Sequence, residues 1–587
     1  MTSFELERLA FTSESVRDWS LLDPRFTNWP VVYLLDNAER KRVPSAPALD
    51  DIYVGESLNA AGRMKQHLDS DEKRHLTTVR VVLDAKFNKS VCLDLESYLI
   101  RMLAGDGVYR VLNRNDGITD AEYYERDAYR AKFREVFDEL KAEGLFSRTI
   151  PEIENDPLFK FSPFKALTQD QAIAVEDILE GLVDDLRTGS PSTLVIQGDP
   201  GTGKTVIAIY IMKLLRDLAA NQSTEDVDAD SLFWDFFVDD VRQLLSDFRI
   251  GIVVPQKSLR ESITKVFRKT PGLSADMVLT PFEVGEAVEP FDLLIVDEAH
   301  RLNQRANQSA GPQNIRFRNI NVDLFGTDDL AKTQLEWITA KSAHQIFLLD
   351  AAQNVRPADL PSEFVLRLIA DARAQERHYL LTSQLRVNAG ADYIDYVRKV
   401  LAGPQAAPEP STFAGYDLRM FDRLGDMHAE IRKRDEEFGL ARLVAGFAWK
   451  WNSKKDRSAF DIELDGERLR WNQTEVDWIA SRTALDEVGS IHTVQGYDLN
   501  YAGVIVGPDL RFDPTAQRVY FDRASYFDKR GMQNNPKLGK YYSDEDVLRF
   551  VTNIYAVLMT RGILGTYLFV CDPPLRTYLE RFFRSSA

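Results

Sequence analysis

The stretch TLVIQGDPGTGKT, residues 193–205, decides the fold of this chain. An apolar run with the character of a strand ends in a glycine-rich loop, and the helical sequence VIAIYIMKLL follows directly. A strand, a loop and a helix in this order form a phosphate-binding cradle, in which Lys204 reaches the outer phosphates and the Thr205 hydroxyl can hold Mg²⁺. We therefore expect ATP to be bound by Gly198, Pro200, Gly201, Thr202, Gly203, Lys204 and Thr205.

A pair of carboxylates follows the next signature, FDLLIVDEAH at residues 291–300. Asp297 and Glu298 stand at the end of an apolar run, where the first can organise the metal ion and the second can activate water. An acidic pair after a strand is often only a turn, so this one gains its weight from following the phosphate loop. The sequence thus predicts hydrolysis of a nucleotide.

The apolar runs STLVIQG, IGIVVP, FDLLIVDEA and HQIFLLDAA alternate with helical segments. This alternation is typical of a parallel sheet with helices on both faces, so we expect an α/β fold. The acidic, aromatic stretch at residues 223–248 interrupts the alternation, and we interpret it as a surface insertion. One option for it is a lid that keeps nucleic acid away until it is displaced.

The composition limits the class of protein. The chain has 587 residues, 44% of them hydrophobic, which is enough for several domains with cores of their own. Its two cysteines, Cys92 and Cys571, exclude a disulfide framework and a thiolate-rich zinc site. The net charge of -18 argues against coating of nucleic acid by bulk positive charge, so any such contact must be local. We find no leader-like or membrane-spanning segment and expect a cytoplasmic protein without a membrane partner.

From about Phe164 to its end, the chain resembles superfamily 1 helicases, and in particular the Schlafen group 3 type. LTQDQ resembles the Q motif, which implies that Gln171 contacts the adenine. FLLDAAQ resembles motif III, which makes Gln353 a candidate sensor of the γ-phosphate. IHTVQGYDLNYAGVIVG resembles motif V, so Thr493, Gln495 and Gly496 are expected to face the nucleic acid or the phosphates.

Two arginines match those that family members direct at the γ-phosphate from the second lobe: Arg386 in SQLRVNAG and Arg561 in NIYAVLMTRG. A planar, permanently charged guanidinium stabilises charge on the transferring phosphoryl group, so both are candidate arginine fingers. In AGFAWKW, Trp449 and Trp451 could stack on bases, although core packing is the more common role for such residues. The resemblance implies ATP and Mg²⁺ as cofactors and nucleic acid, DNA before RNA, as the partner.

The amino-terminal part resembles the GIY-YIG nucleases. VVY at residues 31–33 and YVG at residues 53–55 look like the paired tripeptides of that family, which places Tyr33 and Tyr53 in the site. The other motif positions follow in order as Arg63 and His67 on one helix, Glu96 on a second helix and Asn113 after it. The connection between the tripeptides is longer than is usual in the family.

The chemistry of this set is coherent. A single Mg²⁺ held by Glu96 can polarise the scissile phosphate, while Arg63 neutralises its developing charge. The residue that activates water stays open among Tyr33, Tyr53 and His67, because an unperturbed tyrosine is a poor base at neutral pH. The structural alternative is that the tyrosines pack in the small sheet, His67 lies on the surface and Glu96 pairs with Arg101.

We therefore expect an α/β chain with a small GIY-YIG domain followed by two RecA-like parallel-sheet lobes. The expected bounds are 1–118 for the nuclease-like domain, 119–162 for a helical linker, 163–360 for the first lobe and 361–587 for the second, with an inserted segment at about 410–475. The leading hypothesis is an ATP-dependent nucleic-acid motor, a helicase or translocase, coupled to an endonuclease in anti-phage defence or DNA repair. The alternatives are an ATP-switched nuclease without translocation, and an ATPase with a non-catalytic docking module.

Overall fold

The computed structural model describes residues 4–37, 49–113, 122–220, 233–305, 311–350, 358–382, 391–473, 478, 481, 483–494, 498–529, 531–534, 536, 539 and 541–583. The chain forms two compact units. The first unit contains Met1–Asp184, Val206–Asp247 and Ser262–Asp276. The second contains Asp185–Thr205, Phe248–Glu261 and Met277–Ala587.

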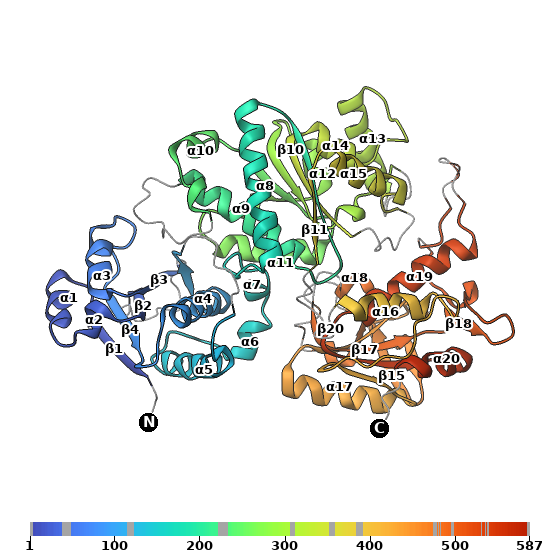
Figure 1. Ribbon diagram of the computed structural model, residues 1–587. Helices are drawn as coiled ribbons and strands as arrows, with labels where there is room; N and C mark the ends of the chain where they lie inside the picture. The colour runs from blue at the N-terminus through green and yellow to red at the C-terminus, as the bar shows by residue number, and fades with distance from the viewer. Residues whose placement is uncertain are drawn as a thin grey trace. The chain divides into compact units, whose positions relative to one another are not determined.

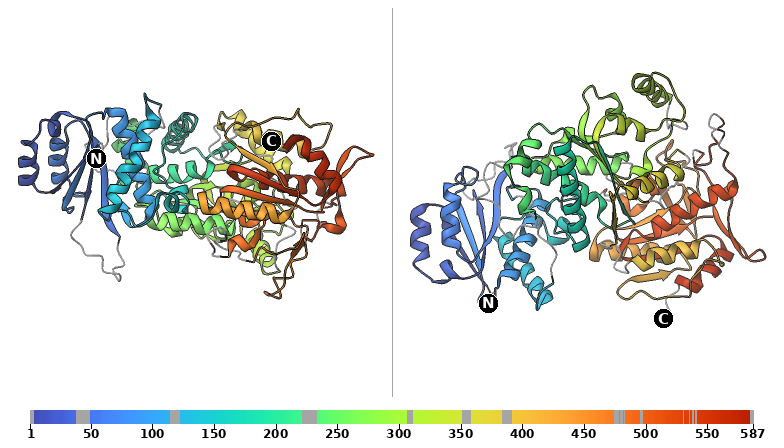
Figure 2. Two further views of the ribbon diagram at one scale, coloured as in Figure 1. Left: turned by 90° about the horizontal axis from the view of Figure 1, so that it is seen from below. Right: turned by 45° about the horizontal axis from the view of Figure 1, so that its top comes forward.

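The first unit begins with a small sheet, here called the N-terminal sheet, of order β1-β4-β2-β3-β5. Its strands are β1 (Glu5–Ala10), β2 (Val31–Asp36), β3 (Asp50–Ser57), β4 (Thr78–Leu83) and β5 (Tyr109–Val111). One face carries α1 (Ser13–Ser20), α2 (Arg25–Asn28) and α3 (Ala60–Asp69), and the other carries α4 (Lys89–Asp106), as Figures 1 and 2 show. Because both faces are covered, every residue of β2 and β4 is buried.

Three helices follow this sheet: α5 (Arg126–Ala142), α6 (Ile150–Glu154) and α7 (Pro157–Lys160). We expected a linker at residues 119–162, but these helices pack on α4. Phe133 and Phe137 of α5 and Ile153 of α6 share one hydrophobic core with α4 and the sheet. The N-terminal domain therefore continues beyond position 118, where the sequence analysis ended it.

The first unit also holds most of α8 (Gln169–Thr188) and α9 (Lys204–Ala220) and all of α10 (Asp239–Leu244). The described part of the acidic stretch is not a loose surface insertion. Phe233 and Phe237 are buried, and the Phe233 ring meets Tyr210 of α9 edge-on at 6.0 Å between ring centroids. These contacts join the described part of the stretch to α9, and the option of a lid stays a prediction.

The second unit contains the P-loop sheet, of order β11-β6-β10-β9-β7-β8. Its strands are β6 (Ser192–Gly198), β7 (Ile250–Val253), β8 (Val278–Leu279), β9 (Phe291–Val296), β10 (Ser342–Leu349) and β11 (His378–Leu381). Each strand pair of this sheet in the described residues is parallel. The second unit also contains α12 (Pro281–Glu286), α13 (Gly311–Phe325), α14 (Gln334–Ala340) and α15 (Ser362–Ala374), whereas α11 (Lys257–Lys269) belongs to the first unit from Ser262 onward.

Strand β11 corrects a predicted boundary. We expected the first lobe to end at position 360, but β11 pairs with β6 from His378↔Val195 to Leu381↔Gly198. Strand β11 therefore completes the P-loop sheet, and α15 is the helix that precedes it. The first lobe extends to at least Leu381.

The second unit also contains the C-terminal sheet, of order β12-β20-β17-β13-β16-β15-β14. Its strands are β12 (Asp417–Met420), β13 (Ala441–Ala445), β14 (Ile462–Leu464), β15 (Glu467–Trp471), β16 (Glu487–Gly489), β17 (Leu499–Val506) and β20 (Gly562–Val570). In the described residues its pairs are parallel except β14 with β15. Mixed α/β architecture with two parallel sheets agrees with the expected pair of RecA-like lobes.

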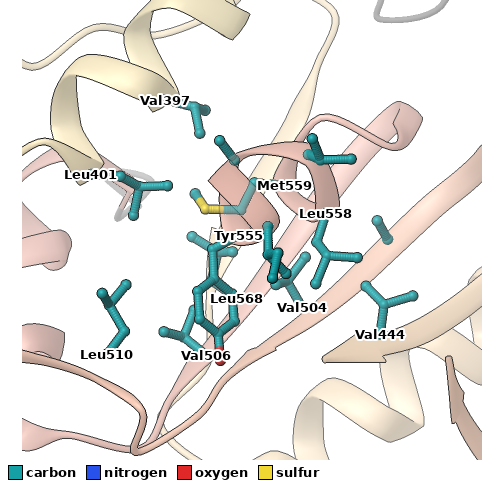
Figure 3. Close-up of a cluster of buried hydrophobic side chains, with 14 of the residues drawn as sticks. Val397, Leu401, Val444, Val504, Val506, Leu510, Tyr555, Leu558, Met559 and Leu568 are labelled. Carbon is teal, nitrogen blue, oxygen red and sulfur yellow. The ribbon is translucent and has the colours of Figure 1, made fainter. Parts of the chain in front are cut away.

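Helices cover both faces of the C-terminal sheet. One core joins the sheet to α16 (Ala391–Leu401), α19 (Asp544–Met559), α20 (Pro573–Phe583) and the hairpin of β18 (Leu510–Asp513) and β19 (Arg518–Phe521). Figure 3 shows the centre of this core, where Tyr555 and Met559 of α19 meet Val504 and Leu568 of the sheet. The opposite face packs on α17 (Leu424–Phe438).

The segment at about 410–475 is not the insertion that we expected. It supplies four strands of the C-terminal sheet, and β13 lies inside the sheet between β17 and β16.

Among the residues that the structure describes, no helix is both long enough and apolar enough to cross a bilayer.

Candidate functional site

The phosphate loop has the backbone that its glycines predict. Gly201 and Gly203 have φ angles of 88° and 81°, in the left-handed region that other residues seldom adopt. Gly198 is required for a different reason, because a Cβ atom there would lie 2.5 Å from Thr202 Oγ1. The loop conformation is therefore fixed by the sequence before any phosphate binds.

Lys204 lies inside this loop. Its side chain is buried, and Nζ donates hydrogen bonds to the carbonyl oxygens of Gly198 at 2.6 Å and of Asp199 at 2.9 Å. The ammonium group thus sits where the loop closes, in the position from which a lysine can reach phosphate oxygens.

Thr205 and Asp297 meet although 92 positions separate them. The Thr205 hydroxyl donates to Asp297 Oδ2 at 2.8 Å, at the end of β9, where Asp297 is only 1% exposed. Burial, followed by the neighbouring charge of Glu298, raises the pKa of Asp297 above its ordinary value. A cation at this point would relieve that repulsion.

A hydroxyl and one carboxylate fit Mg²⁺, which takes one or two carboxylates from a protein and completes its shell with water and substrate phosphates. Within the described ranges, no group of three or more His, Cys, Asp or Glu side chains converges on a metal position. Thr205 and Asp297 are thus the residues that would hold Mg²⁺ here.

Glu298 has an unusual backbone for its type, with a φ of 50° in the left-handed region. His300 follows in a short 3₁₀ turn, Ala299–Arg301, and its Nε2 lies 3.0 Å from Glu298 Oε2. Burial opposes the charge of Glu298, yet its pKa lies well below the ordinary value because the His300 contact and the charge of Lys204 favour the carboxylate. Glu298 therefore stays ionised at physiological pH and can orient water.

Sequence reasoning missed two residues at this site. The His300 Nδ1 atom accepts a hydrogen bond of 3.3 Å from the backbone N–H of Asp350, just after β10. Arg398 of α16 donates to Asp199 Oδ1 at 2.9 Å and lies 3.7 Å from Asp350 Oδ2. The motif DEAH at residues 297–300 could have drawn attention to His300, whereas no sequence motif includes Arg398.

The structure places three other predicted helicase residues. Gln171 is buried in the first turn of α8, where its Oε1 accepts from the Thr168 N–H at 3.1 Å. Arg561 lies between α19 and β20 and is 2% exposed, so its role as an arginine finger remains a prediction. Thr493 is also buried, and its hydroxyl bonds to the backbone of Ser490, so its contact with nucleic acid or phosphates stays a prediction.

The predicted residues Gln353, Arg386, Gln495 and Gly496 lie outside the described residues. Trp449 and Trp451 both pack against the core that the C-terminal sheet shares with α17. Trp451 meets Trp471 edge-on at 5.5 Å between ring centroids. Core packing, the commoner of the two predicted roles, therefore describes both tryptophans.

The N-terminal sheet brings its predicted residues together. Tyr33 of β2 lies 2.8 Å from His67 of α3 through its hydroxyl and Nε2, and the Tyr53 and His67 rings meet edge-on at 5.0 Å between centroids. His67 is 1% exposed, which excludes the alternative that it is a surface residue. Burial, together with the charges of Lys73 and Arg63, lowers the pKa of His67 to about 2, so the imidazole is neutral.

Arg63 and Glu96 belong to the same neighbourhood. Burial raises the pKa of Tyr33 well above its ordinary value, and the charges of Tyr53 and Glu96 add to this rise, while Arg63 opposes it. Tyr33 is fully buried, whereas Tyr53 is partly exposed. Of the two tyrosines, Tyr53 is thus the one that can meet solvent.

Two further contacts hold this N-terminal cluster, defined here as Tyr33, Tyr53, Arg63, His67 and Glu96. Asn113 joins β3 by donating to the Val54 carbonyl at 2.7 Å and accepting from the Val54 N–H at 3.1 Å, and its catalytic role stays a prediction. The Lys73 ammonium lies 4.2 Å from the centroid of the Tyr53 ring. Sequence reasoning did not place Lys73 in the site.

Comparisons with known proteins give one family. The family described as Schlafen group 3, DNA/RNA helicase domain, matches residues 191–572. The uncharacterized protein YPL245W of Saccharomyces cerevisiae is 25% identical over 420 residues, which cover 67% of this chain and 84% of that protein. Replication factor C small subunit 2 of Pyrobaculum islandicum is 25% identical over 152 residues, or 26% of this chain and 37% of that protein.

Among solved structures, the crystal structure of Pif1 helicase from Bacteroides in complex with ADP-AlF3 and ssDNA is 11% identical. The alignment covers 67% of this chain and 91% of that chain, with a TM-score of 0.23. At that score the two chains do not superpose closely.

Proposed function

Because this chain belongs to the Schlafen group 3 DNA/RNA helicase domain family, we propose that it is an ATP-dependent nucleic-acid motor, a helicase or a translocase. The observation that supports ATP hydrolysis most directly is the Thr205–Asp297 hydrogen bond beside a buried Lys204. It unites the two halves of a nucleotide site that lie far apart in the sequence.

In this proposal each residue has one task. Lys204 neutralises the outer phosphates, Thr205 and Asp297 hold Mg²⁺, and Glu298 orients the attacking water. Bound Mg²⁺ supplies positive charge that stabilises the transferring phosphoryl group. Gln171, Gln353, Gly496, Arg386 and Arg561 are proposed to contact the nucleotide as their motifs imply.

We further propose that the N-terminal cluster is a GIY-YIG endonuclease site that hydrolyses phosphodiester bonds. Its convergence supports this, since tyrosine, histidine, arginine and a carboxylate meet on one small sheet. Glu96 would hold Mg²⁺, Arg63 would neutralise the phosphate, and the partly exposed Tyr53 would contact the water. The motor and the nuclease would act on the same nucleic acid, with DNA as the preferred candidate over RNA, in anti-phage defence or DNA repair.

The test is cleavage of labelled single-stranded, duplex and branched DNA, and of matching RNA, in Mg²⁺ with and without ATP. Glu96→Ala should abolish cleavage, because it removes the metal ligand, and Lys204→Ala should alter it through the motor. Glu135→Ala, an exposed glutamate on α5, is the matched control and should leave cleavage unchanged. Wild-type protein that cuts none of these substrates would contradict the nuclease proposal.

The alternatives give different results in the same assay. An ATP-switched nuclease would use about one ATP for each cut, whereas a translocating motor would use many. A docking module in place of a nuclease would bind structured DNA without cutting it, and Glu96→Ala would change neither property.

A further inference from the structure

The turn that follows β9 places an unusual pair of side chains at the nucleotide site. Glu298 and His300 are two positions apart, and the left-handed backbone at Glu298 turns its carboxylate back toward the ring. A side chain in the left-handed region costs about 1 kcal/mol, and such strain is found where a site requires it. His300 itself is completely buried.

Each ring nitrogen of His300 has one contact. The backbone N–H of Asp350 can only donate, so Nδ1, at 3.3 Å, must present its lone pair. The other ring nitrogen, Nε2, lies 3.0 Å from Oε2 of the Glu298 carboxylate.

His300 thereby joins two strands. Its carboxylate partner follows β9, and its backbone partner follows β10, the neighbouring strand in the P-loop sheet. Both contacts are made in the interior, where water competes little with a polar contact. The imidazole therefore connects the backbone at the end of β10 to the carboxylate that follows β9.

We propose that His300 is a positioning residue for ATP hydrolysis: its imidazole holds Glu298 in the orientation that directs water and connects that carboxylate to the end of β10. The inference rests on the proposed ATPase activity. It assigns no nucleotide contact to His300, which acts only through Glu298.

The experiment compares His300→Leu and His300→Gln with Glu298→Gln in ATPase assays, alongside binding of a fluorescent ATP analogue. Leucine removes the hydrogen bond from Asp350 and the 3.0 Å contact with Glu298, so kcat should fall about 10- to 100-fold while the Kd of the analogue changes by less than about twofold. Glutamine keeps a donor near the Nε2 position and should recover most of kcat. His344→Gln, at a second buried histidine on β10, is the matched control and should leave kcat unchanged.

A double variant separates positioning from a structural role. If His300 acts through Glu298, then Glu298→Gln combined with His300→Leu should retain the residual rate of Glu298→Gln alone. Full additivity of the two losses, or a His300→Leu enzyme with wild-type kcat, would overturn the inference while leaving the ATPase proposal intact. Wild-type protein without ATPase activity would overturn both, and the thermal unfolding temperature of each variant identifies a loss caused by misfolding.

Discussion

Asp509 offers a quantitative test of how burial controls charge in this chain. It follows β17 and is completely buried, with Oδ1 accepting a hydrogen bond of 2.6 Å from the Tyr555 hydroxyl. Its second oxygen, Oδ2, has no hydrogen-bond partner among the described residues. Burial, with a smaller contribution from the charge of Asp522, raises the pKa of Asp509 to about 7.

The sign of the pH dependence follows from this rise. The folded protein binds the Asp509 proton more tightly than the unfolded chain, whose aspartate titrates near about 4. This carboxyl therefore contributes most stability in acid, and its contribution falls as pH rises from about 4 to about 7. One pKa unit corresponds to about 1.4 kcal/mol. Relative to acid solution, the stability contributed by this carboxyl is therefore lower by about 4 kcal/mol at pH 8 and by about 1.5 kcal/mol at pH 5.

Asp509→Asn removes the titration but keeps an oxygen for Tyr555. The free energy of opening of the variant, minus that of wild type, should be about 2.5 kcal/mol larger at pH 8 than at pH 5. Any effect of the amide that does not depend on pH cancels in this comparison. Hydrogen exchange of peptides from β17 and α19, followed by mass spectrometry, measures the local free energy of opening, and comparison at equal pH cancels intrinsic rates. Glu545→Gln, an exposed carboxylate on α19, controls for loss of one charge.

The reasoning would be refuted if the difference between Asp509→Asn and wild type were the same at pH 5 and pH 8. That result would mean that the buried carboxyl binds its proton no more tightly in the folded protein than in the unfolded chain.

Three further predictions concern the N-terminal domain. Gly55→Ala should destabilise it by about 1 to 3 kcal/mol in urea unfolding, because the new Cβ would lie 2.4 Å from the Tyr33 hydroxyl; unchanged stability would contradict this. Tyr33→Phe should cost about 1 to 3 kcal/mol by leaving His67 without its 2.8 Å partner, and wild-type stability would show that water replaces the hydroxyl. Arg80→Ala should cost about 3 to 5 kcal/mol because Asp36 and Glu143 both lose the guanidinium that pairs with them, and adding Asp36→Leu should recover part of the loss in the same assay.

The nucleotide site was predictable because its signals are local. Strand, loop and helix adjoin at Gly198–Thr205, and the loop glycines have the backbone angles that this sequence demands. The Thr205–Asp297 contact is distant in sequence, but the carboxyl ends of parallel strands lie at the same edge of a sheet, and only β10 separates β6 from β9.

Other features left no local signal. The contacts of His300 with Asp350 and of Arg398 with Asp199 depend on how separate elements pack, which spacing along the chain does not encode. Strand β12 was hidden in a supposed insertion because it is short and half-buried, without an apolar run. The helices at 119–162 showed their apolar faces, but the sequence did not reveal that α4 is their partner.

The position of β11 also decides how this chain can be divided. It covers the outer side of β6, the strand that leads into the phosphate loop, while β10 covers the inner side. A fragment that stopped at residue 360 would expose the backbone N–H and carbonyl groups of β6 as a free edge, a template for pairing with another copy. Such a fragment should self-associate and precipitate, whereas one that retained α15 and β11 would shield the strand and stay dispersed.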